Sequence, residues 1–311
     1  MIKIKKTITI ISPVYNEEKN IEIFYNNFLE IIEFKKEYDF NFLFCDNKSS
    51  DSTLDVITNL SRIDNRVSAI SYSKNFGVMK SIFSGLNISN SDACAVFDCD
   101  LQDPPELLIK FINGWEKGDK IIYGSRKKRS EKFIFKFLRY CQKNIEFFFK
   151  DYYTTIESGA WFLDRIVVDE IKKSNFDPYL PGLISRLGFD SKPILYQRQI
   201  RNVGYSKFNY KQYIRYGIDG IISGTIRPLK ISIFFAILFS TICFLSTIYF
   251  ILAKFVLKIV FAEGIAAIII INLFGFSLLF FVLAIFSEYL GRIYSKDYER
   301  DLAIIEKKIN L

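Results

Sequence analysis

The chain has 311 residues, and its 42 Lys and Arg against 34 Asp and Glu give a formal net charge of +8. This basic balance favours anionic partners, for which nucleic acid, acidic lipid and phosphorylated substrates are the candidates. The sequence contains no histidine, which excludes the commonest general base and zinc ligand, so any chemistry must use carboxylates, Lys or Arg, backbone amides or a bound metal.

Short apolar runs alternate with helical patterns over the first 125 residues or so. The runs predict strands at Thr7–Ser12, Phe40–Cys45, Val67–Tyr72, Ala93–Phe97 and Lys120–Tyr123. The patterns between them predict helices at Glu17–Phe34, Ser52–Arg62, Val78–Ile88 and Pro105–Trp115. This alternation predicts an α/β fold with a mostly parallel sheet covered on both faces, and ligands at the carboxyl ends of its strands.

Polar residues follow three of these predicted strands. They are Asn16 and Glu17 after the first, Asp46 and Asn47 after the second, and Asp98 and Asp100 after the fourth. Because the carboxyl ends of parallel strands meet at one edge of a sheet, we expect these side chains to converge there.

Four carboxylates, Asp98, Asp100, Asp103 and Glu106, occupy nine residues directly after the fourth strand. Carboxylates this close repel one another unless a cation lies between them, and a hard divalent ion such as Mg²⁺ or Mn²⁺ is the usual one. The stretch also has the pattern of a solvated acidic turn that begins a helix, with Glu106 favouring the helix dipole. Both interpretations can hold, and Asp103 stays undecided between them.

Residues 131–150 combine a basic stripe with many aromatic residues. The stripe consists of Lys132, Lys136, Arg139, Lys143 and Lys150. This spacing predicts an amphipathic helix in the membrane interface, with its basic side toward the lipid headgroups. The alternative is a helix packed on the domain core with its lysines in water. A juxtamembrane helix is expected over residues 210–230.

Two uncharged segments, Ile231–Ala253 and Ile265–Phe286, follow. At about 20 residues per bilayer crossing, each is long enough to span a membrane, and together they predict a two-helix transmembrane hairpin over residues 231–286. No signal peptide is visible, and Lys and Arg flank the hairpin. We therefore expect a multi-pass protein of the inner (plasma) membrane, with the N-terminal domain (residues 1–209), the tail (residues 287–311) and both termini cytoplasmic.

Several motifs together resemble the family 2 glycosyltransferases, above all the polyprenyl-phosphate branch. The motifs are Pro13–Glu18, Lys74–Gly77, Asp98–Glu106, Tyr123–Arg126, Arg201–Phe208 and Glu288–Tyr294. The resemblance covers nearly the whole chain. It implies a GT-A (Rossmann-like) catalytic domain that transfers a sugar from a nucleotide-sugar to a lipid phosphate, with inversion at the anomeric carbon.

By matched position, the resemblance also implies the site. The donor-binding residues would be Pro13, Tyr15, Asn16, Glu17, Asp46, Lys74, Asn75, Gly77 and Asp98. Mg²⁺ or Mn²⁺ would be bound at Asp98, Asp100 and Gln102. The acceptor phosphate would meet Arg126, Arg198, Arg201, Ser206 and Lys207, and the catalytic residues would be Asp98, Asp100 and Glu157.

The chain departs from the family pattern at two places that bear on the site. Asn47 stands where the family's Asp-Asp-Gly-Ser has its second Asp, and Gly159 begins Gly-Ala-Trp-Phe where many relatives carry Asp-Phe-Arg-Leu. An Asp proposed to act in catalysis is therefore absent, although Glu157 lies two residues upstream. A phosphate acceptor needs no general base, because a second pKa of about 6 leaves it anionic at neutral pH.

The resemblance thus implies an enzyme that loads one sugar, with a UDP-sugar favoured as donor, onto undecaprenyl phosphate. Nucleic-acid binding is not expected, because the basic clusters flank membrane-facing segments. A homo-oligomer is possible, since membrane-anchored relatives of this branch are sometimes tetrameric. Two alternatives stay open: a processive polysaccharide synthase, and a degenerate member that binds lipid or a partner protein without catalysis.

Overall fold

The computed structural model describes residues 5–126, 159–174, 180–198, 264–298 and 303–311, together with a few single positions between 238 and 256. The chain divides into two compact units, one of Met1–Gly224 with Arg300–Leu311 and one of Thr225–Glu299. The helices predicted over 131–150 and 210–230, and nearly all of the first predicted membrane span, lie outside the described residues.

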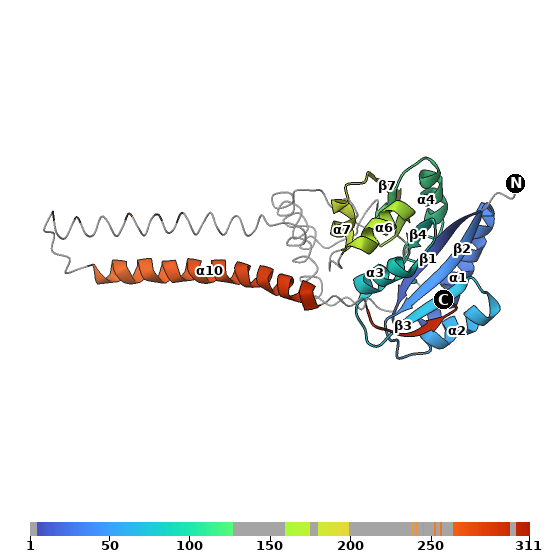
Figure 1. The fold of residues 1–311 in the computed structure, drawn as a ribbon, viewed down its shortest axis with the longest axis horizontal. Helices are drawn as coiled ribbons and strands as arrows, with labels where there is room; N and C mark the ends of the chain where they lie inside the picture. Colours follow the sequence, from blue (N-terminus) through green and yellow to red (C-terminus); the bar gives the residue numbers. More distant parts are fainter. Residues whose placement is uncertain are drawn as a thin grey trace. The chain divides into compact units, whose positions relative to one another are not determined.

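Eight strands of the described residues form one sheet, in the order β7-β5-β6-β4-β1-β2-β3-β8 (Figure 1). They are β1 (Lys6–Val14), β2 (Tyr38–Asp46), β3 (Val67–Tyr72), β4 (Ala93–Val96), β5 (Ile121–Arg126), β6 (Trp161–Asp164), β7 (Ser191–Tyr196) and β8 (Ile305–Ile309). β6 runs antiparallel to both its neighbours and β8 runs antiparallel to β3, while the other neighbouring strands are parallel. The predicted α/β class is confirmed, and the sheet is mixed.

Helices cover both faces of this sheet, as predicted. On one face, α1 (Glu18–Ile32), α2 (Thr53–Ile63) and α4 (Leu107–Glu116) share a buried apolar cluster with the strands, and a 3₁₀ turn, η1 (Glu33–Lys35), follows α1. On the other face, α3 (Val78–Ile88), α6 (Arg165–Lys173) and α7 (Leu180–Arg186) do the same. Neighbouring strand residues such as Ile10 and Ile11 enter opposite clusters, because side chains alternate along a strand.

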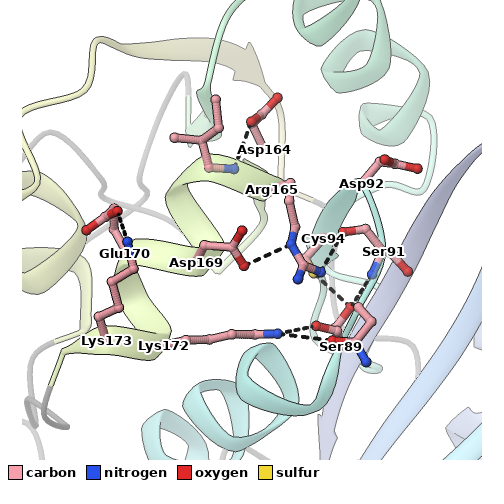
Figure 2. Close-up of polar contacts among 12 residues, drawn as sticks. Ser89, Ser91, Asp92, Cys94, Asp164, Arg165, Asp169, Glu170, Lys172 and Lys173 are labelled. Atoms are coloured by element: carbon pink, nitrogen blue, oxygen red, sulfur yellow. Dashed lines mark hydrogen bonds and ion pairs between the residues drawn. The ribbon is translucent and has the colours of Figure 1, made fainter.

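Polar contacts fix α6 to the amino end of β4 (Figure 2). Asp164 caps the helix by accepting a hydrogen bond from a backbone N–H of its first turn at 3.0 Å. Arg165 donates to the carbonyl oxygen of Ser91 at 3.4 Å, and Lys172 donates to that of Ser89 at 2.6 Å. Because β6 leads directly into α6, these contacts also hold β6 in place beside β4.

The last residues of the chain return to the edge of the sheet. β8 lies along β3, with Lys307 opposite Ser71, and Asn310 donates to the carbonyl oxygens of Ser61 and Val67 at 2.8 and 3.2 Å. Two residues before β8, Ala303 is buried in the core. The sequence pattern predicted no strand in this segment.

The second unit contains α10 (Ile265–Tyr298), which includes the second uncharged segment. Among the residues that the structure describes, no helix long and apolar enough to cross a membrane was found. The transmembrane hairpin is therefore not confirmed and stays a prediction.

Candidate active site

The carboxyl ends of β1 to β5 and of β7 all lie at one edge of the sheet, because these strands run in the same direction. The predicted convergence of the polar residues that follow β1, β2 and β4 is confirmed. The loops at this edge are also strained. Asn16, Lys48 and Leu101 have φ angles of 53°, 60° and 54°, a left-handed conformation that is uncommon outside glycine and often marks functional loops.

Asp46 shapes the loop that follows β2. Its residue is 1% exposed, and its Oδ1 accepts hydrogen bonds from the backbone N and the Oγ of Ser49 at 3.1 and 2.5 Å. Its Oδ2 accepts from the Oγ of Ser71, on β3, at 2.7 Å. Both carboxylate oxygens therefore have partners within the protein, which fixes the predicted donor-binding Asp46 between its own loop and β3.

Hydrogen bonds join the loops after β1 and β2. The Asn16 N–H donates to Ser49 Oγ at 2.9 Å, and Asn16 Oδ1 accepts from the Ser50 N–H at 2.8 Å. The Glu17 N–H donates to Thr53 Oγ1 at 2.8 Å. These contacts bring together the predicted donor residues Asn16, Glu17 and Asp46 as one surface.

The loop after β3 belongs to the same surface. Its Phe76 N–H donates to the side-chain oxygen of Asn47 at 3.3 Å, so Asn47 acts as a link between loops. Lys74 Nζ lies 5.1 Å from the centre of the Phe76 ring, and the Gly77 N–H donates to Asn75 Oδ1 at 2.9 Å. Of the remaining predicted donor residues, Pro13 lies within β1 and Tyr15 directly follows it, 36% exposed.

The acidic stretch after β4 forms a cluster with Gly159. Asp100 Oδ1 accepts from the backbone N–H of the predicted metal ligand Gln102 at 3.1 Å. Asp103 is 2% exposed, and its Oδ2 is buried without a hydrogen-bond partner. A Cβ added at Gly159 would lie 2.8 Å from Asp98 Oδ2 and 3.2 Å from Asp103 Oδ2. Glycine at this position leaves room for the two carboxylates.

The pKa of Asp98 reflects this crowding. Asp98 is half-buried, and burial, followed by the charges of the Asp100 and Asp103 carboxylates, raises its pKa to about 7, although Arg198 and Arg126 act in the opposite direction. Like charges near a buried carboxyl favour its protonated form, and a cation would favour the charged form.

Two predicted acceptor-site arginines lie beside the acidic cluster, Arg126 through Tyr196 and Arg198 directly. Arg126 ends β5, and its Nε donates to the hydroxyl of Tyr196, at the end of β7, at 3.3 Å. The Tyr196 hydroxyl donates a short hydrogen bond to Asp103 Oδ1, and Arg198 Nε lies 4.0 Å from the same oxygen. The sequence pattern did not single out Tyr196, because its role depends on the pairing of β7 with β5.

The carboxylates fit a hard divalent cation. The Asp100 and Asp103 carboxylates lie close enough to Asp98 to raise its pKa, and Asp103 Oδ2 is buried without a hydrogen-bond partner. A cation bound at Asp98 and Asp100 would offset this concentration of negative charge. Carboxylate oxygens are the ligands that Mg²⁺ and Mn²⁺ prefer. Within the described ranges no group of three or more acidic or Cys side chains is placed to hold a metal ion alone. A bound ion would need further oxygen ligands, as a diphosphate supplies.

Several predicted site residues fall elsewhere. The proposed catalytic residue Glu157 and the acceptor-site residues Arg201, Ser206 and Lys207 lie outside the described residues. Glu106 stands at the amino end of α4 but makes no capping hydrogen bond with its side chain. The burial of Asp103 and its hydrogen bond from Tyr196 exclude the solvated, helix-capping role for this residue.

The chain is similar to known proteins in its sequence and in its fold. The family model "Glycosyl transferase family 2" matches residues 9–171. The uncharacterized glycosyltransferase YkcC of Bacillus subtilis is 31% identical over 311 residues, covering 97% of this chain and 94% of that protein. The prophage-derived bactoprenol glucosyl transferase of Shigella flexneri is 29% identical over 308 residues, covering 96% and 97%. A Mycobacterium tuberculosis glucosyl-3-phosphoglycerate synthase structure with Mn²⁺, UDP-glucose and phosphoglyceric acid aligns with 68% of this chain and 76% of its own, at 16% identity and a TM-score of 0.49.

Proposed function

The chain belongs to glycosyl transferase family 2 and is a glycosyltransferase, and on that premise we propose that it transfers one sugar from a nucleotide-sugar to polyprenyl phosphate. The observation that carries this proposal is the meeting of an acidic cluster, Asp98 to Asp103, with Arg126 and Arg198. Such a site offers separate places for a cation with a leaving diphosphate and for a second anion. The nearly full-length similarity to proteins named bactoprenol glucosyl transferase supports a polyprenyl acceptor, with undecaprenyl phosphate the first to test.

Asp98 and Asp100 would hold Mg²⁺ or Mn²⁺, which when bound offsets the negative charge that builds up on a departing nucleoside diphosphate. The joined loops after β1, β2 and β3 lie at the same sheet edge and would bind the nucleoside. Because Asp46 is fixed by Ser49 and Ser71, this surface is formed before the donor arrives, and a preformed surface loses less entropy on binding. We favour a UDP-sugar as the donor.

Arg126 and Arg198 would orient the acceptor phosphate, since a guanidinium matches phosphate with paired hydrogen bonds. A phosphate oxygen forms the new bond to the anomeric carbon, while the bond from that carbon to the diphosphate breaks and its electron pair leaves with the diphosphate. The acceptor is already ionised at neutral pH, so no base has to remove a proton. Attack from the face opposite the leaving group inverts the anomeric carbon.

We also propose that the reaction takes place at the cytoplasmic face of the plasma membrane. The uncharged segments of residues 231–253 and 265–286 support this placement. Large apolar side chains along α10, among them Phe274, Phe281 and Phe286, are exposed, and exposed apolar surface of this extent marks a partner or a lipid environment. Fusion of a cytoplasmic reporter and an exported reporter to the C-terminus tests the orientation, and activity of the exported reporter would contradict it.

The proposed reaction is tested with the full chain, purified in detergent with polyprenyl phosphate, Mg²⁺ or Mn²⁺, and a panel of nucleotide-sugars. We expect a lipid-linked monosaccharide from the wild type and none from Asp100→Asn. Asp39→Asn is the control, because Asp39 is an exposed acid at the amino end of β2. A polymeric product would instead indicate the processive synthase, and an unimpaired Asp100→Asn would refute the assigned cation site.

A further inference from the structure

Asp103 and Tyr196 form a buried polar pair inside the acidic cluster. Asp103 is 2% and Tyr196 5% exposed, and the Tyr196 hydroxyl donates to Asp103 Oδ1. Burial, followed by the charge of Asp103, raises the pKa of Tyr196 to about 12. The hydroxyl therefore stays protonated at neutral pH, and its proton is directed at Asp103.

The same hydroxyl holds Arg126. Arg126 and Tyr196 are direct neighbours in the parallel pairing of β5 with β7, and Arg126 Nε donates to the Tyr196 oxygen at 3.3 Å. A tyrosine hydroxyl has one proton to give and lone pairs to accept with. Tyr196 uses both, so the contact fixes the direction of the Arg126 guanidinium relative to Asp103.

Arg198, in the segment that follows β7, lies near this pair, but its Nε forms no hydrogen bond with it. Its Nε is buried without a hydrogen-bond partner and lies 4.0 Å from Asp103 Oδ1, beyond hydrogen-bond distance. Asp103 Oδ1 accepts from Tyr196, while Asp103 Oδ2 and Arg198 Nε are both buried without a hydrogen-bond partner. A buried guanidinium nitrogen without a hydrogen-bond partner destabilises the folded protein unless a ligand accepts a hydrogen bond from it.

We propose that Asp103 and Tyr196 are positioning residues, which hold the guanidinium groups of Arg126 and Arg198 toward a phosphate group bound in front of Asp98. Both arginines lie within electrostatic reach of Asp98. The phosphate belongs either to the acceptor or to the diphosphate of the donor, and the chemistry recognised is the same. This inference rests on the proposed glycosyl transfer, and it adds two residues that act through the arginines without touching the substrate.

Tyr196→Phe tests the inference with the smallest change. Without the hydroxyl, Arg126 Nε loses its acceptor and Asp103 loses its hydrogen-bond donor, so the Asp103 carboxylate draws Arg198 away from the phosphate. We expect the KM for polyprenyl phosphate to rise about tenfold or more, with kcat at saturating acceptor and the KM for the donor unchanged within about twofold. A rise confined to the donor KM and the Kd for the nucleoside diphosphate also supports positioning and assigns the phosphate to the donor.

Tyr25→Phe is the matched control. The Tyr25 hydroxyl donates to Asp64 at 2.6 Å, and Asp64 also binds Arg66, so the same three residue types meet far from the site. This variant should lower Tm without changing either KM. Tyr196→Phe would overturn the inference if it lowered Tm in the same way and left both KM values unchanged, because the pair would then only support the fold.

Two further measurements separate this inference from the proposed function. If Tyr196→Phe does not fold, Asp103→Asn replaces it, because Asn keeps an oxygen that accepts from Tyr196 but loses the charge that faces Arg198. We expect this variant to raise the KM for the acceptor or the KM for the donor, as for Tyr196→Phe. If the wild type transfers no sugar to polyprenyl phosphate, the proposed acceptor is wrong. In that case, calorimetry measures the affinity of the wild type and of Tyr196→Phe for pyrophosphate. We expect Tyr196→Phe to bind pyrophosphate more weakly, and equal affinities of the two proteins would overturn the positioning role.

Discussion

At the scale of single residues, Asp98 makes stability depend on pH in the absence of metal. Its pKa is about 7 in the folded protein against an ordinary value of 3.8. Between these values the folded state holds a proton that the unfolded state has released, so the free energy of unfolding falls as the pH rises. We expect Asp98→Asn to have a higher Tm than the wild type at pH 8 in EDTA, and the difference to shrink at pH 5.

Thermal unfolding at the two pH values, with Asp39→Asn as the control for loss of one surface carboxylate, measures this difference. An equal difference at pH 5 and pH 8 would contradict the raised pKa of Asp98. Added Mg²⁺ should reduce the advantage of Asp98→Asn at pH 8, because a bound cation stabilises the charged carboxylate.

Gly159 provides a second test at this scale. A Cβ at this position would lie 2.8 Å from Asp98 Oδ2, which real Cβ contacts do not show, so the carboxylate must move. We expect Gly159→Ala to lower kcat/KM by at least about tenfold, since displacements near 1 Å in a reacting site are costly. Gly264→Ala is the control, because a Cβ there meets nothing within 4 Å. Equal activity of both variants would show that Gly159 does not shape the site.

Sequence reasoning found the residues whose position follows from a single strand. Asp46, Asp98 and Asp100 were predicted because each comes directly after a buried apolar run. The partners of Asp103 were not predicted, since Tyr196 and Arg198 reach it only through the pairing of β7 with β5. Such a contact depends on strands that are neighbours in space and distant in sequence.

At the scale of elements, a charged cap joins α2 to β3. Asp64 ends α2, and its hydrogen bonds from Arg66 hold its pKa near 2 against partial burial, with Tyr25 adding a further bond. Because this pKa is lower in the folded protein, the stabilisation is present above about pH 4 and is lost as the pH falls toward 2. We expect Asp64→Asn to reduce the free energy of unfolding by about 1–2 kcal/mol at pH 7, allowing for the exposure of Arg66.

Denaturant unfolding of Asp64→Asn and the wild type at pH 7 and pH 2.5 measures this contribution. The difference between the two proteins should become smaller at the lower pH. A constant difference would mean that Asp64 acts through the shape of the turn alone.

β8 ties the end of the chain to the donor surface. Its Lys307 lies opposite Ser71 of β3, whose hydroxyl donates to Asp46. Its Glu306 forms an ion pair with Lys48, which lies in the loop after β2. A chain that stops after residue 302 should have a lower Tm and a weaker affinity for nucleoside diphosphate, because β3 loses its edge partner. Glu306→Gln should change Tm little, since both members of that ion pair are well exposed. An unchanged affinity after truncation would exclude this role of β8.

The predicted strands and helices of the first 125 residues are confirmed within a few residues, and Val78–Ile88 has the predicted bounds. These elements have buried apolar runs or a clear helical period. β6 was missed because it is only four residues long, and β7 because half of its residues are exposed and it has no buried apolar run. β8 is rich in Lys and Glu and follows a long apolar helix, so only its pairing with β3 identifies it.

At the scale of the whole molecule, one sheet edge gathers loops from nearly every strand of the first unit. The loops after β1, β2 and β3 form one hydrogen-bonded surface, and those after β4, β5 and β7 form the cluster of acids and arginines. A donor on the first surface would place its diphosphate and sugar toward the second. In the proposed reaction, the order of the strands would let a chain without histidine align an ionised acceptor with a leaving group.

The most direct test of this account is mass spectrometry of the lipid product made by the purified full chain from undecaprenyl phosphate, Mg²⁺ or Mn²⁺ and a panel of nucleotide-sugars. We predict a mass increase of one sugar per lipid with at least one donor, abolished by EDTA and by Asp100→Asn. Transfer that persists in EDTA, a polymer on the lipid, or no product with any donor would contradict the proposed reaction.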